Sequence, residues 1–246
     1  MSDAPADLPP TRAFALPVAG GEIRGDELPG NEPGYLFVHG LGSVRRGLKS
    51  DSLLLHAAQR RRRFLRIDQR GHGESSGRIG QVKVSTLVDD VRRVVQLMES
   101  CVVVGSSLGG LVAAFAAVAE PQRVRGLCLI APAFGLLANL ERRLDARGEL
   151  QTSNGLSFPV LSEVLADAHA LALAEPSLPF DLVVPTLVVH GTNDDVIPPI
   201  FSERFFATIR HAQKDLWIVD GGDHRLVDHA AETWLRLDRL VDSRGR

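Results

Sequence analysis

A serine that could act as a nucleophile, Ser107, lies in the pentapeptide Gly-Ser-Ser-Leu-Gly of residues 105–109, which has the pattern G-x-S-x-G. The apolar run 101–104 precedes this pentapeptide, and the apolar run 108–119 follows it. Such a context predicts a sharp turn from a buried strand into a buried helix, which lifts the serine oxygen clear of the backbone. The turn needs small residues on either side because strand and helix approach closely there. The alternative interpretation is an ordinary turn with a serine at the helix N-cap.

A serine nucleophile needs a general base, and the base needs an acid that orients it. Candidates follow Ser107 in the order Asp then His, which is the order expected after a turn of this kind. Asp194 comes after the apolar run that ends at His190, and His224 comes after the next apolar run. Since the carboxyl ends of parallel strands meet at one edge of a sheet, we expect the three side chains to lie together there. Asp195, the next residue, is an alternative acid.

The elements that would position these residues are short apolar runs that alternate with helical patterns. Near-continuous apolar runs are typical of parallel strands that are covered on both faces. The predicted strands are residues 35–39, 64–68, 101–105, 126–131, 186–190 and 216–219, after a leading hairpin at 14–18 and 22–24. The predicted helices are residues 52–59, 86–98 with Ser85 as a cap, 108–119 and 226–241. This alternation predicts an α/β fold with a mostly parallel, doubly wound sheet of about eight strands.

A long stretch without a clear strand separates the run that ends at Ala131 from the run that begins at Thr186. A structureless loop of that length would be improbable inside a compact domain. We therefore expect one domain over residues 1–246 with a small helical cap inserted at about residues 133–182. The alternative is a pair of ordinary crossover helices joined by a mobile loop.

Five motifs occur in one order along the chain. They are H-G-L-G at 39–42, D-Q-R-G-H-G-E-S at 68–75, G-S-S-L-G at 105–109, H-G-T-N-D with a later proline at 190–198, and G-D-H at 222–224. In this combination the chain resembles the α/β-hydrolase superfamily of serine hydrolases, from about Tyr35 onward. The resemblance implies the α/β-hydrolase fold.

The resemblance also implies roles for single residues. Ser107 would be the nucleophile, His224 the general base and Asp194 the acid that orients it. The backbone N–H groups of Leu41 and Leu108 would form the oxyanion hole, where side-chain identity matters little.

Neighbouring candidates receive other roles from the same comparison. The register of the fourth motif favours Asp194 over Asp195 as the acid, and Ser106 would point away from the tip of the turn. The resemblance gives turn or rim positions, and not the role of base, to three other histidines: His39, His72 and His190. No group of residues has the spacing of metal ligands, so we expect neither a metal nor a cofactor.

The chemistry implied is acyl transfer to water, because a serine at the tip directs attack at an acyl carbon. The expected substrates are small-molecule carboxylic esters or acyl thioesters, with acylated proteins as a further class. The alternatives are a serine peptidase or a cofactor-free haloperoxidase or lyase on the same triad, and a ligand-binding module without catalysis.

A narrower resemblance rests on residues 47–51, 74–77, 131–135 and 158–173. These stretches are similar to a subgroup of mitochondrial palmitoyl-protein thioesterases and acyl-glucuronide esterases and their bacterial relatives. That subgroup implies an apolar acyl pocket, and the cap offers Leu136, Leu137, Leu140, Val160, Leu161, Val164 and Leu165 to line it. Each of these residues is equally well explained as core between cap and sheet.

The composition of the chain bears on whether it binds nucleic acid or inserts into a membrane. A formal net charge of −2 gives no electrostatic footprint for nucleic acid. The four arginines of residues 60–63 are interpreted as the solvated end of a helix. No apolar run reaches transmembrane length, so we expect no stable membrane insertion. Cys101 and Cys128 lie in apolar runs and are expected to be buried free thiols. Residues 1–10 contain acidic side chains and no arginine-rich leader, which favours a bacterial cytoplasmic location.

Overall fold

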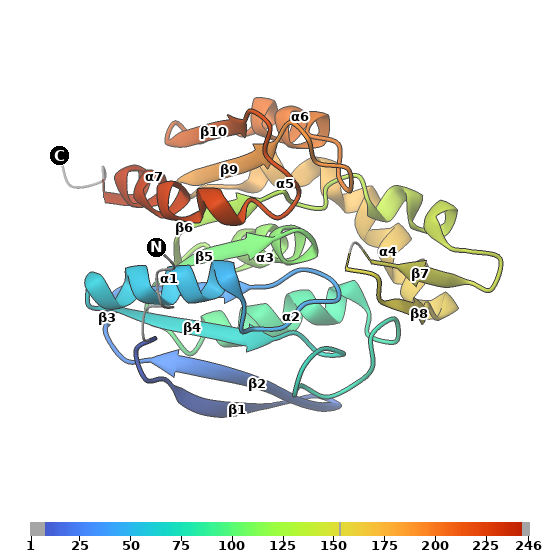
Figure 1. Ribbon diagram of the computed structural model, residues 1–246, viewed down its shortest axis with the longest axis horizontal. Helices are drawn as coiled ribbons and strands as arrows, with labels where there is room; N and C mark the ends of the chain where they lie inside the picture. Colours follow the sequence, from blue (N-terminus) through green and yellow to red (C-terminus); the bar gives the residue numbers. More distant parts are fainter. Residues whose placement is uncertain (1–7, 153, 243–246) are drawn as a thin grey trace, which may run out of the picture.

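The computed structural model describes residues 8–152 and 154–242 of the chain. Within these residues the main sheet has eight strands in the order β1-β2-β4-β3-β5-β6-β9-β10 (Figure 1). The strands are β1 (Arg12–Val18), β2 (Gly21–Leu28), β3 (Asn31–Val38), β4 (Arg62–Asp68), β5 (Cys101–Ser106), β6 (Val124–Ile130), β9 (Thr186–Gly191) and β10 (Lys214–Val219). Among the described strands of this sheet, only the pairs β1–β2 and β2–β4 are antiparallel. The predicted mostly parallel, doubly wound sheet is confirmed.

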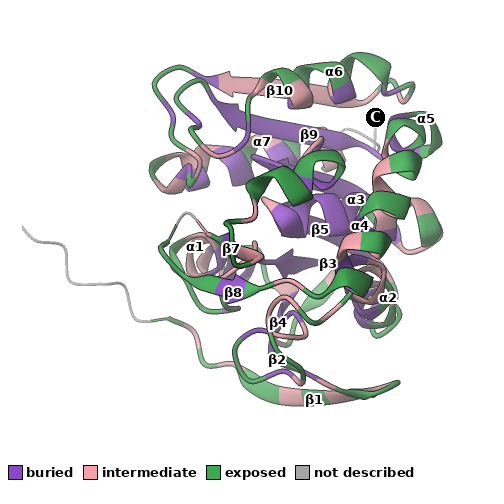
Figure 2. Ribbon diagram, turned by 90° about the vertical axis from the view of Figure 1, so that its right-hand side faces the viewer, coloured by how far each residue is buried: buried purple, intermediate pink, exposed green. Residues whose placement is uncertain are grey.

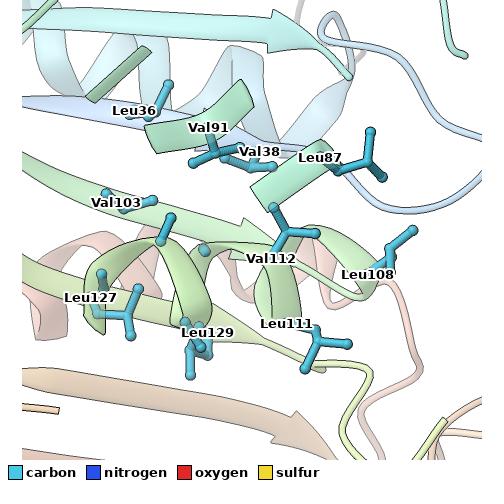
Figure 3. Packing of buried hydrophobic residues seen from close by; sticks show 14 of the residues in the cluster. Leu36, Val38, Leu87, Val91, Val103, Leu108, Leu111, Val112, Leu127 and Leu129 are labelled. Atoms are coloured by element: carbon cyan, nitrogen blue, oxygen red, sulfur yellow. The ribbon is translucent and has the colours of Figure 1, made fainter. Parts of the chain in front are cut away.

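Helices cover both faces of this sheet. On one face lie α1 (Leu48–Gln59) and α7 (Ala230–Asp242); on the other lie α2 (Val84–Val95), α3 (Leu108–Ala119) and α6 (Ile200–Thr208). Side chains alternate along β5, so that Val103 packs with α2 and α3 (Figure 3), whereas Val102 and Val104 pack with α1 and α7. Each central strand is therefore buried on both sides, which explains its continuous apolar character.

The helices differ from the sequence predictions in their bounds, in one cap and in number. Helix α1 begins at Leu48 and not at residue 52, and α7 begins at Ala230, after a 3-10 turn, and not at residue 226. The helix predicted at 86–98 begins at Val84, and Ser85 is not its cap. Instead, Asp167 of α4 (Ser162–Ala174) accepts hydrogen bonds from the backbone nitrogen of Ser85, at 3.0 Å, and from its hydroxyl. A carboxylate 82 residues away in the sequence thus accepts a hydrogen bond from a free backbone N–H group at the start of α2. Local sequence patterns do not reveal such a contact. Helix α6 was not predicted at all.

The segment between β6 and β9, called the insertion below, lies beyond the carboxyl ends of the parallel strands (Figure 1). It contains two 3-10 helices, η1 (Leu137–Arg143) and η2 (Glu175–Ser177), the strands β7 (Glu149–Gln151) and β8 (Ser157–Pro159), and the helices α4 and α5 (Leu178–Asp181). Strands β7 and β8 pair antiparallel. The prediction of a purely helical insertion is therefore wrong in this respect. Figure 2 views the insertion from outside and shows that much of α4 is exposed. In β8 the central residue, Phe158, is buried.

The arginine run 60–63 is more than a solvated helix end. Arg60 follows α1, whereas Arg63 lies in β4 and forms ion pairs with Glu27 at 2.8 Å and Glu32 at 2.9 Å. In the described part of the chain no helix is long and apolar enough to cross a membrane. The expectation about a leader falls mostly on residues 1–7, which lie outside the described residues.

Candidate active site

Ser107 lies at the turn between β5 and α3 in a backbone conformation that few residues adopt, with φ 55° and ψ −122°. An added Cβ at Gly105 would lie 2.3 Å from the carbonyl oxygen of Gly109, and one at Gly109 would lie 2.3 Å from that of Val38. The predicted need for small residues around the serine therefore has a direct steric cause. Ser107 occupies the N-cap position but makes no side-chain capping bond, so the ordinary-turn alternative does not describe it. A positive φ at a non-glycine residue costs energy and is typical of functional turns.

Asp194 and His224 form a hydrogen-bonded pair. The Nδ1 atom of His224 lies 2.7 Å from the Oδ2 atom of Asp194. The Oδ1 atom of the same carboxylate accepts hydrogen bonds from the backbone nitrogens of Val196 and Ile197, both at 2.8 Å. Asp194 is buried, whereas Asp195 is exposed. Between the two candidate acids, Asp194 is the residue that contacts the histidine.

A second histidine contacts the same carboxylate. His190 is fully buried at the end of β9, and its Nε2 atom lies 3.0 Å from Asp194 Oδ2. Its Nδ1 atom lies 2.7 Å from the hydroxyl of Ser202 in α6. Burial alone would raise the pKa of Asp194, but hydrogen bonds from His190, His224 and the Ile197 backbone outweigh it and hold the pKa well below its usual range. Asp194 is therefore ionised at neutral pH. Sequence reasoning missed Ser202, for which no motif provides a signal.

The loop of residues 40–42 lies directly against the serine turn. An added Cβ at Gly40 would be 3.0 Å from the Cβ atom of Ser107. Leu41 in this loop and Leu108, the first residue of α3, line the same cavity as Ser107. Within the described residues, neither backbone N–H donates a hydrogen bond; for Leu108 this is usual, because it is the first residue of a helix. Two free N–H donors beside a serine could bind a negatively charged oxygen.

Two buried histidines are hydrogen-bonded to the backbone of this loop. His39 Nδ1 donates to the Gly40 carbonyl at 2.8 Å, and its Nε2 atom accepts from the backbone nitrogen of Gln69 at 3.0 Å. His72 Nε2 accepts from the backbone nitrogen of Gly42 at 3.1 Å. Each acceptor nitrogen requires a neutral ring. Burial lowers the pKa of His39 to about 4, assisted by repulsion from His72, and burial also lowers the pKa of His72.

A cavity of about 540 Å³ contains this constellation. Ser107 and His224 both line it, although within the described residues no hydrogen bond joins the two side chains. The insertion closes one side with apolar and polar groups: Leu136, Arg143, Leu150, Gln151, Thr152 and Asn154. The lining residues thus come from the serine turn, the loop 40–42, the histidine loop and the insertion.

An adjoining apolar cavity of about 60 Å³ shares several lining residues with the larger one: Leu41, Leu108, Leu136 and Leu150. Five of the predicted acyl-pocket residues line the smaller cavity: the shared residue Leu136 together with Leu137, Leu140, Val160 and Val164. Leu161 and Leu165 line neither of these two cavities, and Leu161 is 40% exposed. Leu137 and Leu140 also belong to the main core. For these two residues, lining of the cavity and packing between insertion and sheet therefore both hold.

The sequence model of the alpha/beta hydrolase family matches residues 35–234. The chain belongs to the alpha/beta hydrolase family. Mitochondrial palmitoyl-protein thioesterase ABHD10 of Mus musculus is 26% identical to this family member over 236 residues, which cover 87% of this chain and 77% of the thioesterase. The solved structure of mouse alpha/beta hydrolase domain-containing protein 10 is similar, with a TM-score of 0.82 and 24% identity, over 94% of this chain and 99% of that chain. Est1E of Butyrivibrio proteoclasticus, with ferulic acid bound, has a TM-score of 0.74 and 18% identity, over 92% of this chain and 100% of that chain.

These similarities confirm the expected fold and the expected family. They also confirm the narrower resemblance, because the matched relative is a mitochondrial palmitoyl-protein thioesterase. As an alpha/beta hydrolase, the chain is an enzyme of the hydrolase class.

Proposed function

We propose that this hydrolase cleaves carboxylic esters or acyl thioesters with Ser107, His224 and Asp194 as a catalytic triad. The observation that carries the proposal is the 2.7 Å hydrogen bond between His224 and Asp194 beside a serine held at a strained turn in the same cavity. An ionised acid, an oriented histidine and a serine that lines the substrate cavity are the groups that acyl transfer requires. Similarity to a relative named as a thioesterase supports the substrate class.

In the proposed reaction, the Ser107 oxygen attacks the acyl carbon while His224 takes the hydroxyl proton through Nε2. The carbonyl oxygen becomes negative, and the N–H groups of Leu41 and Leu108 donate hydrogen bonds to it. The bond from the acyl carbon to the leaving oxygen or sulfur then breaks, and His224 returns the proton to the leaving group. Water, deprotonated by the same histidine, attacks the acyl-enzyme, and the release of the carboxylic acid regenerates Ser107.

The acyl chain is proposed to lie along the larger cavity toward the smaller apolar one. The shared residues Leu41, Leu108 and Leu136 connect the two cavities next to the serine turn. In this proposal the protein is a single domain over residues 1–246, and residues 133–182 act as its cap. The assignment as a cap is supported by the residues of the insertion that line both cavities. If it is correct, the preference for acyl length depends on these residues.

The test is hydrolysis of p-nitrophenyl esters of increasing acyl length, followed by the matching thioesters. We expect Ser107→Ala to reduce kcat by at least about 10⁴-fold, whereas the exposed Ser177→Ala serves as a control and keeps wild-type activity. A fluorophosphonate should label Ser107 in the wild type and leave the Ser107→Ala variant unlabelled. Turnover that survives in Ser107→Ala, or cleavage of peptides in place of esters, would contradict the proposal.

A further inference from the structure

Lys49 joins the two loops that carry the proposed nucleophile and base. Its Nζ atom donates hydrogen bonds to the Ser106 hydroxyl and to the Arg225 carbonyl, both at 2.8 Å. Ser106 directly precedes Ser107, and Arg225 directly follows His224. One side chain therefore connects the neighbours of both groups, and it also lines the cavity that contains them.

The alternation of side chains along β5 explains how this contact arises. Ser106 points to the same face of the strand as Val102 and Val104, which is the face covered by α1 and α7. Lys49 lies in the first turn of α1, on that face. The serine that does not reach the tip of the turn thus becomes an acceptor for a cation from the neighbouring helix.

The position of Lys49 is unfavourable for stability. Lys49 is half-buried, and among the described residues its ammonium group forms no ion pair with a carboxylate within 4.0 Å. A cation in the first turn of a helix also faces the positive end of the helix dipole. Burial, assisted by the Arg225 guanidinium, lowers the pKa of Lys49 to about 8 against the opposing effect of Asp223 and Asp194. A half-buried cation without a contacting anion adds little to the stability of a fold, which points to a role of this lysine in function.

We propose that Lys49 is a positioning residue, which holds the Ser107 turn and the His224 loop at a fixed separation for acyl transfer. This inference rests on the proposed function of the site. Two of the three N–H donors of the ammonium group are used by Ser106 and Arg225, and charge-assisted hydrogen bonds of this kind are stronger than those of a neutral amine. Among the described residues, no other side chain is hydrogen-bonded to both the serine turn and the histidine loop.

The test uses Lys49→Met, which keeps the length of the side chain and removes the charge, and Lys49→Arg, which keeps the charge at all pH values. The exposed Lys83→Met is the control for loss of a lysine elsewhere. We expect Lys49→Met to lower kcat on a p-nitrophenyl ester by about 100-fold, the size of effect that a displacement of about 1 Å produces, with KM little changed. Fluorophosphonate labelling of Ser107 should slow by a similar factor. Lys49→Arg should recover part of the loss.

Two pH-dependent readouts separate positioning from a merely structural role. The wild-type kcat should decline above about pH 8, as Lys49 loses its proton, and this decline should be absent from Lys49→Met and Lys49→Arg. The melting temperature of Lys49→Met should equal or exceed that of the wild type. Because the folded pKa lies below the unfolded value of 10.5, the stability gain of the variant is full below pH 8 and disappears as the pH rises toward 10.5.

The inference is overturned if Lys49→Met retains kcat and labelling rate within about twofold of the wild type, or if only KM changes, which would assign Lys49 to substrate binding. Failure of the proposed function looks different. In that case wild-type Ser107 would resist fluorophosphonate and Ser107→Ala would keep its turnover, whatever the behaviour of Lys49.

Discussion

The Nε2 atom of His72 accepts a hydrogen bond from the backbone nitrogen of Gly42 at 3.1 Å. Its other ring nitrogen lies 3.2 Å from the carbonyl oxygen of Arg70. The ring therefore holds the proton on Nδ1 and offers a lone pair to the loop that contains Leu41. In this way a motif that looks purely structural in the sequence is connected to one of the two proposed oxyanion donors.

The first prediction concerns this contact. His72→Leu leaves the Gly42 N–H without an acceptor, and we expect kcat to fall by roughly tenfold with a small change in KM, because the loop is displaced rather than removed. Because burial lowers the pKa of His72 below its usual value, the ring stays neutral at neutral pH and the contact is lost only on acidification. Ester hydrolysis between pH 5 and 8 measures both effects. The exposed His169→Leu is the matched control; an equal loss of kcat there would refute the role of His72.

The second prediction concerns the serine turn. Gly109→Ala places a Cβ atom 2.3 Å from the Val38 carbonyl oxygen and 2.4 Å from that of His39. We expect a loss of about 3 kcal/mol or more in the free energy of unfolding, measured by urea denaturation. Gly47→Ala meets nothing within 4 Å and should change stability by no more than about 0.5 kcal/mol. Equal stabilities for the two variants would mean that the turn relaxes around the added methyl group.

The third prediction distinguishes the two adjacent acids. Asp194→Asn keeps the shape of the side chain but removes the charge that orients His224, so kcat should fall by about 10⁴-fold. Asp195→Asn, at an exposed position on the cavity rim, should leave kcat nearly unchanged. Steady-state kinetics on one ester decides between them. A larger loss in the Asp195 variant would reverse the assignment.

The fourth prediction concerns Glu175, which connects η2, late in the insertion, to the first loop of the insertion after β6. Its Oε1 atom accepts from the Gly135 backbone nitrogen at 2.6 Å, while, among the described residues, its buried Oε2 atom has no hydrogen-bond partner. Burial raises the pKa of Glu175 to about 7, against the effect of the Gly135 bond. A raised carboxyl pKa penalises folding above pH 7 and has no effect below the unfolded value of 4.5.

Glu175→Gln, which is neutral throughout, should therefore melt at a higher temperature than the wild type at pH 8 and at the same temperature at pH 4. Thermal melts at the two pH values measure the difference. The exposed Glu141→Gln should show no such dependence. A constant offset at both pH values would mean that ionisation of Glu175 is not responsible.

Much of the fold could be predicted because its strands are buried on both faces and its turns carry distinctive residues. Ser107, Asp194 and His224 each follow such a strand, and the structure brings them to one edge of the sheet, with Asp194 and His224 in direct contact. The predicted enzyme class, a hydrolase of esters or thioesters, is confirmed at that level. The catalytic roles of the single residues remain predictions.

What the sequence did not reveal depends on contacts between distant segments. Asp167 replaces the expected cap at Ser85, and Ser202 contacts His190 from a helix that was not predicted. The strands β7 and β8 are three residues each, too short for a periodic pattern. No sequence pattern indicates the position of Lys49 between the serine and histidine loops, because the two groups that accept its hydrogen bonds lie 57 and 176 residues away.

The chain contains two cysteines, and both are buried in the sheet. Burial raises the pKa of Cys101 to about 12 and raises that of Cys128 further, so neither forms a thiolate near neutral pH. Both native thiols are therefore expected to react very slowly with thiol reagents. A cysteine introduced by Leu173→Cys on α4, where the leucine is 75% exposed, would be the single reactive handle for a dye or spin label, and it would report directly on motion of the insertion in solution.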